Sequence, residues 1–376
     1  MNRLSSQTSE RIAFFLATPW GDGAERVVVT LANAICERGL KLDLVVYQSD
    51  SYREQVSKHI RLIDLHSSGA MASIPSLVRY LREVRPKTVL STIEQANIAL
   101  LIARRLSGVP ARIIIREANT TSRMLDTTKG VRGMLYRKLL PICYPWADGI
   151  VAVSQGVADN LTSKLHLPKT KVSVIYNPVA LDQLLKNASA PVDHPWFEPG
   201  QPPVVTGVGR LSLQKDFATL IRAFAQLRSC IKARLLILGE GEERGKLEEL
   251  ARELNVQKDM LLPGYVKNPH PYIARSSLFV LSSAFEGLPN ALIEALALGI
   301  PVVSTDCESG PREILDNGRL GRLVPVADPN ALSLAMLETL NQVEKKPISQ
   351  EDLSKFDLDS AVDAYIRMLT GSGEAP

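Results

Sequence analysis

Short apolar segments rich in β-branched residues alternate with longer segments of helical periodicity through the first half of the chain. This alternation is typical of βαβ units, whose strands form a parallel sheet that helices cover on both faces. We predict buried strands at residues 12–18, 42–47, 62–65, 88–92, 113–116, 149–154 and 172–176. Between them we predict helices at residues 24–38, 75–84, 96–106, 131–140 and 156–165.

A proline-rich stretch with little periodicity, residues 177–203, interrupts this rhythm, and such stretches are common at domain boundaries. The alternation then resumes. Strands are predicted at residues 204–208, 235–238, 260–262, 278–281 and 302–305. Helices are predicted at residues 217–227, 244–254, 290–298, 330–340 and 358–369.

The predicted fold class is therefore α/β, with two Rossmann-like parallel-sheet domains facing each other across a crevice. Residues 1–180 form the N-terminal domain, 181–203 a Pro-rich linker region and 204–355 the C-terminal domain. Residues 356–376 form a last helix and a tail. Because open α/β sheets bind ligands outside the carboxyl ends of their strands, the crevice is the natural ligand site.

The composition is that of an ordinary soluble globular protein, with 45% apolar and 22% charged residues among 376. It excludes a disordered chain, a collagen-like fibre and a small disulfide-stapled domain. The four cysteines lie far apart without Cys-x-x-Cys spacing, which argues against a zinc ribbon or redox motif and suits a reducing cytoplasm. No apolar run approaches the roughly 20 residues that a membrane-spanning helix needs.

The net charge of +4 conceals an uneven distribution. Residues 1–180 carry 24 Lys and Arg against 14 Asp and Glu, whereas residues 181–376 carry 20 against 26. A basic half suggests an anionic partner for that half alone. Solvated surface charge without a partner explains the same numbers, so both interpretations stay open at this point.

A glycine turn, Gly21-Asp22-Gly23, follows the first predicted strand and opens the first helix. Free backbone N–H groups and the helix dipole make this a good place for a phosphate. A dinucleotide-binding fingerprint is disfavoured, because Arg26 occupies its third glycine position and the second strand ends without a ribose-binding acid. An ordinary tight turn is the alternative.

A second glycine loop, from Gly207 to Asp216, follows the first strand of the second domain. Arg210 and Lys215 lie on this loop, where two cations could grip a diphosphate. Asp216 is a plausible N-cap for the next helix. The alternative is a pair of solvated surface cations.

The stretch 285–303 is the most informative part of the sequence. Glu286 lies on a loop, and Glu294 lies within a helix whose neighbours are nearly all Ala, Leu and Ile. A carboxylate in such surroundings is costly to bury without a partner, and ligand hydroxyl groups are one such partner. The Glu-x7-Glu spacing lets both carboxylates face the same crevice. An intramolecular salt bridge is the alternative for Glu294.

Three motifs in this order resemble the retaining nucleotide-sugar glycosyltransferases of family 4, of the bacterial cell-surface polysaccharide and lipid-linked glycan type, which have the GT-B fold. They are Gly-Arg-Leu-Ser-x-Gln-Lys-Asp at 209–216, Glu-Gly-Leu-Pro-Asn-Ala-Leu-Ile-Glu-Ala at 286–295 and Gly-Ile-Pro-Val-Val-Ser-Thr-Asp at 299–306. Ser309-Gly310-Pro311-Arg312-Glu313-Ile314 fits the family as well. The resemblance is specific over residues 204–325 and diffuse over 11–180.

The resemblance implies that the second domain binds the donor. Arg210 and Lys215 would bind its diphosphate and stabilise the leaving group, Glu294 would accept hydrogen bonds from the ribose, and Glu286 would contact the transferred sugar. Arg210, Lys215 and Glu286 are the catalytic candidates. The remaining donor-binding candidates act through glycine turns and backbone groups, and they are Gly21, Gly23, Gly209, Gly264, Val266, Gly287, Leu288 and Asn290.

The resemblance also implies that no cofactor and no metal ion is required, that stereochemistry is retained, and that residues 358–369 cross back to the first domain. One departure concerns the first domain, where many relatives have a histidine near the transferred sugar. This chain has Arg116, Glu117 and Asn119 in that region, which are candidates to meet the sugar or the acceptor. We expect all five histidines at surface or turn positions, and they are His59, His66, His166, His194 and His270.

The expected reaction transfers a hexose or N-acetylhexosamine from a nucleotide-sugar, UDP by analogy, to a glycan acceptor. We expect the acceptor to be a polyprenyl-diphosphate-linked oligosaccharide or lipopolysaccharide, and the protein to be cytoplasmic and peripheral on the inner face of the plasma membrane. Two basic segments of the N-terminal domain, 79–87 and 131–140, could contact an anionic membrane. Alternatively, Met134, Leu135 and Leu139 simply pack on the sheet.

Two other function classes stay open, and no nucleic-acid partner is expected. An NAD-dependent oxidoreductase is disfavoured by Arg26 and the missing ribose acid. A non-catalytic nucleotide-sugar-binding protein is disfavoured because Arg210, Lys215, Glu286 and Glu294 are all present.

Overall fold

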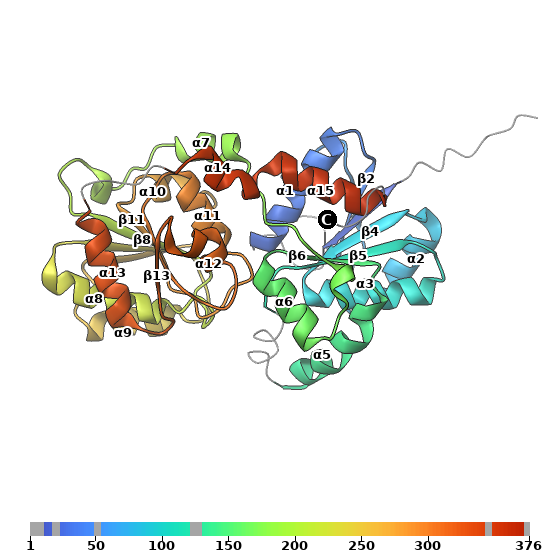
Figure 1. The fold of residues 1–376 in the computed structure, drawn as a ribbon, viewed down its shortest axis with the longest axis horizontal. Helices are drawn as coiled ribbons and strands as arrows, with labels where there is room; N and C mark the ends of the chain where they lie inside the picture. The colour runs from blue at the N-terminus through green and yellow to red at the C-terminus, as the bar shows by residue number, and fades with distance from the viewer. Residues whose placement is uncertain (1–10, 17–22, 49–53, 121–129, 343–347, 372–376) are drawn as a thin grey trace, which may run out of the picture. The chain divides into compact units, whose positions relative to one another are not determined.

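The computed structural model describes residues 11–16, 23–48, 54–120, 130–342 and 348–371 (Figure 1). It divides into two compact units. The first unit consists of Met1–Asn177 together with Leu358–Pro376, and the second unit consists of Pro178–Asp357.

The first unit is built on a parallel sheet of seven strands in the order β3-β2-β1-β4-β5-β6-β7. The strands β1, β2 and β5 are buried along nearly their whole length, as expected for a sheet with both faces covered. The register aligns Phe14 with Leu44 on one side and Leu90 on the other, so that all three lie in one core. The strands are β1 (Ile12–Leu16), β2 (Leu42–Val46), β3 (Arg61–Asp64), β4 (Thr88–Thr92), β5 (Arg112–Glu117), β6 (Gly149–Ala152) and β7 (Val172–Val174).

All the described helices of the first unit except the last one connect one strand of this sheet to the next. One of them begins at a conventional N-cap, where the Ser154 hydroxyl accepts a hydrogen bond from the Val157 N–H at 3.2 Å. They are α1 (Gly23–Glu37), α2 (Ile74–Val84), α3 (Glu94–Ser107), α5 (Gly130–Cys143), α6 (Gln155–Lys164) and α15 (Leu358–Thr370). Short 3₁₀ turns follow α5 at Tyr144–Trp146 and precede β7 at Lys169–Lys171.

Helix α15 belongs to the first unit although it follows the whole second unit in the sequence. It lies beside α1 and β4 and buries Val362, Tyr365 and Leu369 in the same core (Figure 1). The Thr88 hydroxyl donates a hydrogen bond to the Leu369 carbonyl oxygen at 2.7 Å, and Arg38 pairs with Asp363 at 2.9 Å. The helix therefore completes a core that the first 177 residues leave open.

The second unit has a parallel sheet of six strands in the order β10-β9-β8-β11-β12-β13. The strands are β8 (Val204–Val208), β9 (Arg234–Leu238), β10 (Met260–Gly264), β11 (Leu278–Leu281), β12 (Val302–Thr305) and β13 (Arg322–Val324). The helices are α7 (Leu181–Ala188), α8 (Phe217–Cys230), α9 (Arg244–Glu253), α10 (His270–Ala274), α11 (Asn290–Ala297), α12 (Pro311–Ile314), α13 (Pro329–Leu340) and α14 (Gln350–Leu353). Short 3₁₀ turns lie at Pro195–Phe197, Asp316–Gly318 and Ser354–Phe356.

Asp216 caps helix α8, as the sequence predicts, since its carboxylate accepts the Thr219 N–H at 3.2 Å. The segment 181–203 differs from an extended linker, because it contains α7 and a 3₁₀ turn. The Asn268 side chain donates to the Asn187 carbonyl oxygen at 3.0 Å, which joins α7 to the segment before α10. Leu184 and Ala188 are buried there, so this region packs as part of the second unit.

The strand order confirms the predicted α/β fold with two Rossmann-like sheets. In each unit the order reverses once, between β1 and β4 in the first and between β8 and β11 in the second. The loops that leave the carboxyl ends of these strands diverge to opposite faces of the sheet, and ligands of such folds bind between them. The residues on these loops are therefore candidates for a ligand-binding site.

Replacing Leu369 by alanine should lower the free energy of unfolding of the first unit by about 2–5 kcal/mol, because this side chain is fully buried where α15 meets the sheet. Leu213, which is 73% exposed, gives the control, and Leu213→Ala should change the same quantity by less than about 0.5 kcal/mol. Urea unfolding followed by circular dichroism measures both. Equal free energies of unfolding for wild type and Leu369→Ala would mean that α15 does not contribute to the core.

Candidate functional site

The switch point of the second sheet brings Lys215 and Glu286 together. Lys215 follows β8 and Glu286 follows β11, and Lys215 Nζ donates to Glu286 Oε1 at 2.6 Å. The Ser283 hydroxyl donates to the same oxygen, also at 2.6 Å. The two charged side chains are 20% and 5% exposed, respectively, so the pair lies at the bottom of the two loops rather than on their surface.

Further hydrogen bonds join these two loops. The Ser282 hydroxyl donates to the Lys215 carbonyl oxygen at 2.8 Å, and the Ala284 N–H donates to the Gln214 carbonyl oxygen at 2.8 Å. The Gln214 side chain donates to the Phe285 carbonyl oxygen at 3.1 Å. The positions of Lys215 and Glu286 are therefore fixed by the backbone as well as by their own ion pair.

Cys307, which follows β12, is buried close to this pair. Burial raises the pKa of its thiol to about 12, the negative charge of Glu286 adds to the rise, and Lys215 opposes it. The thiol is therefore neutral near pH 7 and is not a nucleophile there. It is a small buried side chain beside the ion pair.

Two glycines let the loops of this edge approach one another. A Cβ at Gly239, which follows β9, would overlap the carbonyl oxygen of Gly209. Gly310 has a φ of +90°, and a Cβ there would lie 2.7 Å from Pro289 Cδ and 3.0 Å from the Gly287 carbonyl oxygen. A larger residue at either position would push apart the loops that carry the candidate site residues.

Arg210 is not part of the Lys215–Glu286 pair. Its guanidinium lies 3.4 Å from the carboxylate of Glu242, and both side chains are more than half exposed. An exposed ion pair of this kind contributes little to stability, so little holds Arg210 in place. The structure thus places one of the two predicted diphosphate-binding cations at a fixed position and the other on the surface.

Glu294 lies on α11 and contacts His270, the first residue of α10, with 3.4 Å between Glu294 Oε2 and His270 Nε2. The prediction that all five histidines occupy surface or turn positions is wrong for His270, which is only 8% exposed. Its helix follows the loop after β10, and that loop turns the imidazole inward towards α11. The intramolecular pairing that the sequence left open for Glu294 is therefore present, with a histidine as the partner.

The remaining donor candidates of the second unit lie on the same edge. Gly264 ends β10 with a φ of +93°, and its carbonyl oxygen accepts the Gly239 N–H at 2.9 Å. Val266 packs at the margin of a small apolar cluster, and Leu288 is buried. Gly287 and Asn290 lie between Glu286 and Glu294, where Asn290 begins α11.

In the first unit, Gly23 begins α1, whereas Gly21 lies outside the described residues.

The loop after β4, at the switch point of the first sheet, contains a residue with an unusual backbone conformation. Ile93, between β4 and α3, has φ +72° and ψ +138°, a conformation that β-branched residues rarely adopt. Such strain costs about 1–3 kcal/mol and occurs often at functional sites. It places Glu94 at the carboxyl edge of the sheet as the first residue of α3.

Glu94 and Glu117 form a buried carboxyl pair at this edge. Tyr144 donates its hydroxyl to Glu117 Oε2 at 2.6 Å, while Oε1 of each glutamate has no donor among the described residues. Burial raises the pKa of both carboxyl groups, and the charge of Glu94 raises that of Glu117 further. Both shifts favour the neutral form of these carboxyl groups.

Arg116 is fully buried as well and donates to Thr92 Oγ1 at 2.9 Å and to Asn177 Oδ1 at 2.6 Å. Side chains as enclosed as Arg116 and Glu117 support the sheet edge from within and do not themselves reach a ligand on the surface. Asn119 is half-buried, and its N–H donates to the Glu117 carboxylate. Of the three acceptor candidates, Asn119 is the one with an accessible side chain.

The sequence analysis missed Glu94, Tyr144 and His270. A signal for Glu94 existed, because an acidic residue directly after a buried strand and before an apolar helix lies at the ligand edge of a parallel sheet. Tyr144 and His270 gave no such signal, since their partners lie 27 and 24 positions away, at Glu117 and Glu294.

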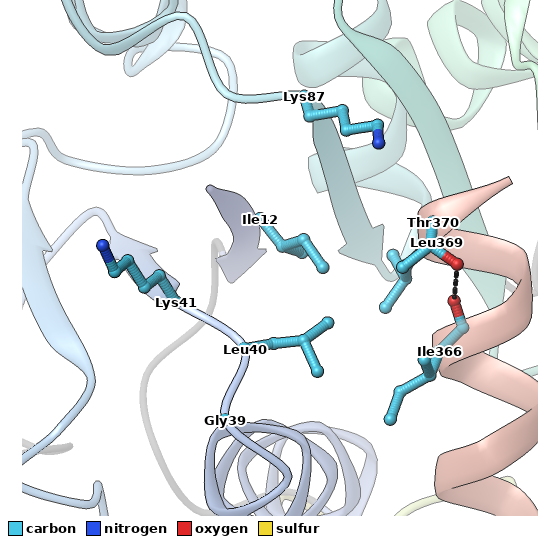
Figure 2. Close-up of a pocket in the computed structure, with 8 residues that line it drawn as sticks. All are labelled: Ile12, Gly39, Leu40, Lys41, Lys87, Ile366, Leu369 and Thr370. Atoms are coloured by element: carbon cyan, nitrogen blue, oxygen red, sulfur yellow. Dashed lines mark hydrogen bonds between the residues drawn. The ribbon is translucent and has the colours of Figure 1, made fainter. Parts of the chain in front are cut away.

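A pocket of about 360 Å³ lies at the opposite edge of the first sheet, where β1, β2 and β4 begin. Figure 2 shows its apolar lining, including Ile12, Leu40 and Leu369, with Lys41 and Lys87 at the sides. Because it opens at the amino ends of the strands, it is separate from the candidate site residues of this unit.

Comparison with known families identifies the protein. Residues 21–183 match the family model described as Glycosyltransferase Family 4, and residues 202–342 match the model described as Glycosyl transferases group 1. The chain belongs to glycosyltransferase family 4. The motifs around Lys215, Glu286 and Glu294 all fall within the second matched region.

This glycosyltransferase is similar to two curated bacterial proteins over most of its length. It is 29% identical over 334 residues, covering 86% of this chain and 88% of the relative, to the N-acetylgalactosamine-N,N'-diacetylbacillosaminyl-diphospho-undecaprenol 4-alpha-N-acetylgalactosaminyltransferase of Campylobacter jejuni. It is 28% identical, covering 92% of this chain and 95% of the relative, to the lipopolysaccharide core biosynthesis glycosyltransferase LpsE of Rhizobium meliloti.

Solved structures agree on the fold of this glycosyltransferase, which is GT-B. HepE of Anabaena, solved in complex with UDP, matches with a TM-score of 0.77 at 16% identity, covering 96% of this chain and all of that one. Sucrose-phosphate synthase of Thermosynechococcus elongatus matches with a TM-score of 0.82 at 18% identity, covering 97% of this chain and all of that one. None of the helices in the described part of the chain has the length and apolar character needed to span a membrane.

The raised pKa of Glu117 predicts a pH-dependent stability of the first unit of this glycosyltransferase. Burial raises the folded-state pKa of Glu117 above its ordinary value near 4.5, so the stability it contributes is complete below that value and is lost as the pH rises through the folded pKa. Glu117→Gln keeps the shape and the bond from Tyr144 but removes the titration. Wild type should therefore lose more thermal stability than this variant between about pH 5 and pH 8.

Thermal unfolding followed by circular dichroism at both pH values measures this difference. Glu198→Gln, at an exposed position of the second unit, is the control and should follow the wild type. Identical pH profiles for wild type and Glu117→Gln would contradict a raised pKa of Glu117.

Proposed function

We propose that this glycosyltransferase transfers a hexose or N-acetylhexosamine from a nucleotide-sugar, with UDP as the nucleotide, to a lipid-linked glycan with retention of configuration. The observation that carries the proposal is the Lys215–Glu286 pair at the switch point, with Glu294 one helix further along. These residues supply a cation for a diphosphate and carboxylates for sugar hydroxyl groups at the edge where Rossmann-like sheets bind ligands.

The donor roles follow from the charges and contacts of the site. Lys215 Nζ has three donors, and its bond to Glu286 uses one of them, so the others are available to a diphosphate. Arg210 swings from its weak surface contact with Glu242 to the same diphosphate. Glu286 and Glu294 accept hydrogen bonds from the transferred sugar and the ribose, respectively.

The proposed chemistry needs no metal ion, because Lys215 and Arg210 neutralise the charge that develops on the leaving diphosphate. The bond from the anomeric carbon to the diphosphate oxygen breaks, and the acceptor oxygen bonds to that carbon on the same face. The acceptor proton passes to the departing diphosphate oxygen. UDP as the nucleotide is supported by the similar fold of HepE, which was solved with UDP.

A lipid-linked acceptor is supported by the relatives, one of which is named for a diphospho-undecaprenol acceptor and another for lipopolysaccharide core biosynthesis. Helix α5 adds a physical argument. Met134 and Leu135 are 54% and 44% exposed, so they do not pack on the sheet, and Arg137 and Lys138 are exposed next to them. An apolar and basic helix face of this kind favours the surface of an anionic membrane.

Lys215→Ala and Glu294→Ala should each lower the kcat/KM for the donor about a hundredfold, because each removes a charged group that binds the donor. Product formation from radiolabelled donor with a panel of lipid-linked acceptors measures the effect, after a thermal-shift screen of UDP-, GDP- and ADP-sugars has selected the donor. Activity should survive EDTA. Lys246→Ala, at a surface lysine paired with Glu243, is the matched control.

Wild-type rates from both site variants would refute these roles. Donor binding without product from any acceptor would instead favour the non-catalytic nucleotide-sugar-binding protein.

A double variant, Met134→Ser with Leu135→Ser, should reduce co-sedimentation with phosphatidylglycerol-rich vesicles severalfold, because it removes the apolar part of the α5 face. Arg137→Glu with Lys138→Glu should have a similar effect that is largest at low salt. Leu213→Ser, which changes an exposed leucine of the second unit, is the control. A wild-type protein that ignores these vesicles even at low salt would contradict membrane contact.

A further inference from the structure

His270 is a buried histidine of the second unit. It is 8% exposed, and neither ring nitrogen has a hydrogen-bond partner in the described part of the chain. Among the described residues, its imidazole contacts the carboxylate of Glu294, with 3.4 Å between Nε2 and Oε2. Burying an imidazole with an unsatisfied nitrogen destabilises a fold relative to an apolar side chain of similar shape.

The backbone around His270 is firmly held. The His270 N–H donates to Asn268 Oδ1 at 3.3 Å, and Asn268 in turn donates to the Asn187 carbonyl oxygen of α7 at 3.0 Å. Arg275, at the end of α10, donates to the Ala188 carbonyl oxygen at 3.2 Å. The imidazole is therefore presented to Glu294 from a fixed position rather than from a loose loop.

Glu294 depends on this contact. Its side chain is 16% exposed, and in the described part of the chain no other cationic side chain lies within ion-pair distance of it. A carboxylate binds two adjacent hydroxyl groups more tightly when its plane is already fixed, because ordering the side chain on binding costs free energy. Apolar neighbours on α11 cannot fix that plane by hydrogen bonding.

We propose that His270 is the positioning residue of Glu294: its imidazole, 3.4 Å from Oε2, restricts where that carboxylate oxygen can lie and leaves Oε1 to the ribose hydroxyl groups of the nucleotide. This inference rests on the proposed donor role of Glu294. The same short segment, 264–270, ends at His270 and contains the donor-binding candidates Gly264 and Val266, whose turn the family resemblance implies to hold the base. It therefore couples recognition of the base to the orientation of the ribose-binding acid.

His270→Phe separates this role from a structural one. The variant should keep or raise the melting temperature, because an apolar ring replaces a poorly satisfied imidazole. It should weaken UDP binding, measured by calorimetry, about tenfold, and raise the KM for the donor by a similar factor with kcat nearly unchanged. His270→Gln, whose amide N–H reaches a similar position, should recover most of the affinity.

A double-mutant cycle with Glu294→Gln tests whether His270 acts through Glu294. In the Glu294→Gln background, His270→Phe should cause no further loss of UDP affinity. His66→Phe is the matched control, because His66 forms a histidine–carboxylate contact of 3.3 Å with Asp64 in the first unit, and it should leave UDP affinity unchanged.

Three results would overturn the inference. Wild-type UDP affinity in His270→Phe, while Glu294→Gln is weakened, would show that the histidine does not position the acid. A lower melting temperature together with a lower kcat would show a structural role. Wild-type protein that binds none of UDP, GDP and ADP, or Glu294→Gln with full affinity, would refute the proposed donor site itself and the inference with it.

Discussion

The constraint that organises this protein is the single reversal of strand order in each parallel sheet. At that point the connecting helices leave to opposite faces, and the two loops between them cannot be covered by either helix. In the second unit these loops meet through the Lys215–Glu286 pair. In the first unit one of them contains the strained Ile93 and places Glu94 beside Glu117. The chemistry-bearing side chains of both units thus lie where the topology leaves room.

The two units treat buried charge in opposite ways. The second unit pairs a carboxylate with a cation, since Lys215 contacts Glu286 where both side chains are largely buried. The first unit places two buried carboxyl groups together, and burial raises the pKa of both. The carboxylate–cation pair of the second unit suits the proposed binding of sugar hydroxyl groups. The carboxyl pair of the first unit suits a role in holding its loops together.

Most of the fold was predictable from the sequence, because long apolar runs and helical periodicity are local properties. Short elements were not, and α7, α10 and β13 carry too few residues, or too many prolines, for a periodic signal. The motif residues Lys215, Glu286 and Glu294 could be selected because their types are unusual in their local surroundings. Their partners could not, since the contact of Glu294 with His270 depends on how two short helices pack. Local sequence patterns identify charged side chains that are unfavourable to bury, whereas only the packed structure identifies the partners that stabilise them.

The position of α15 has a consequence for the order in which the chain can fold during synthesis. The ribosome releases the strands of the first sheet before any residue of the second unit, yet Val362, Tyr365 and Leu369 complete that sheet's core from beyond the second unit. Domains generally fold as they emerge, N-terminal first. Here the earlier unit must wait with part of its apolar surface uncovered until the later one has been made. The second unit can reach its native state first, and the nascent first unit is the species that most needs chaperone protection.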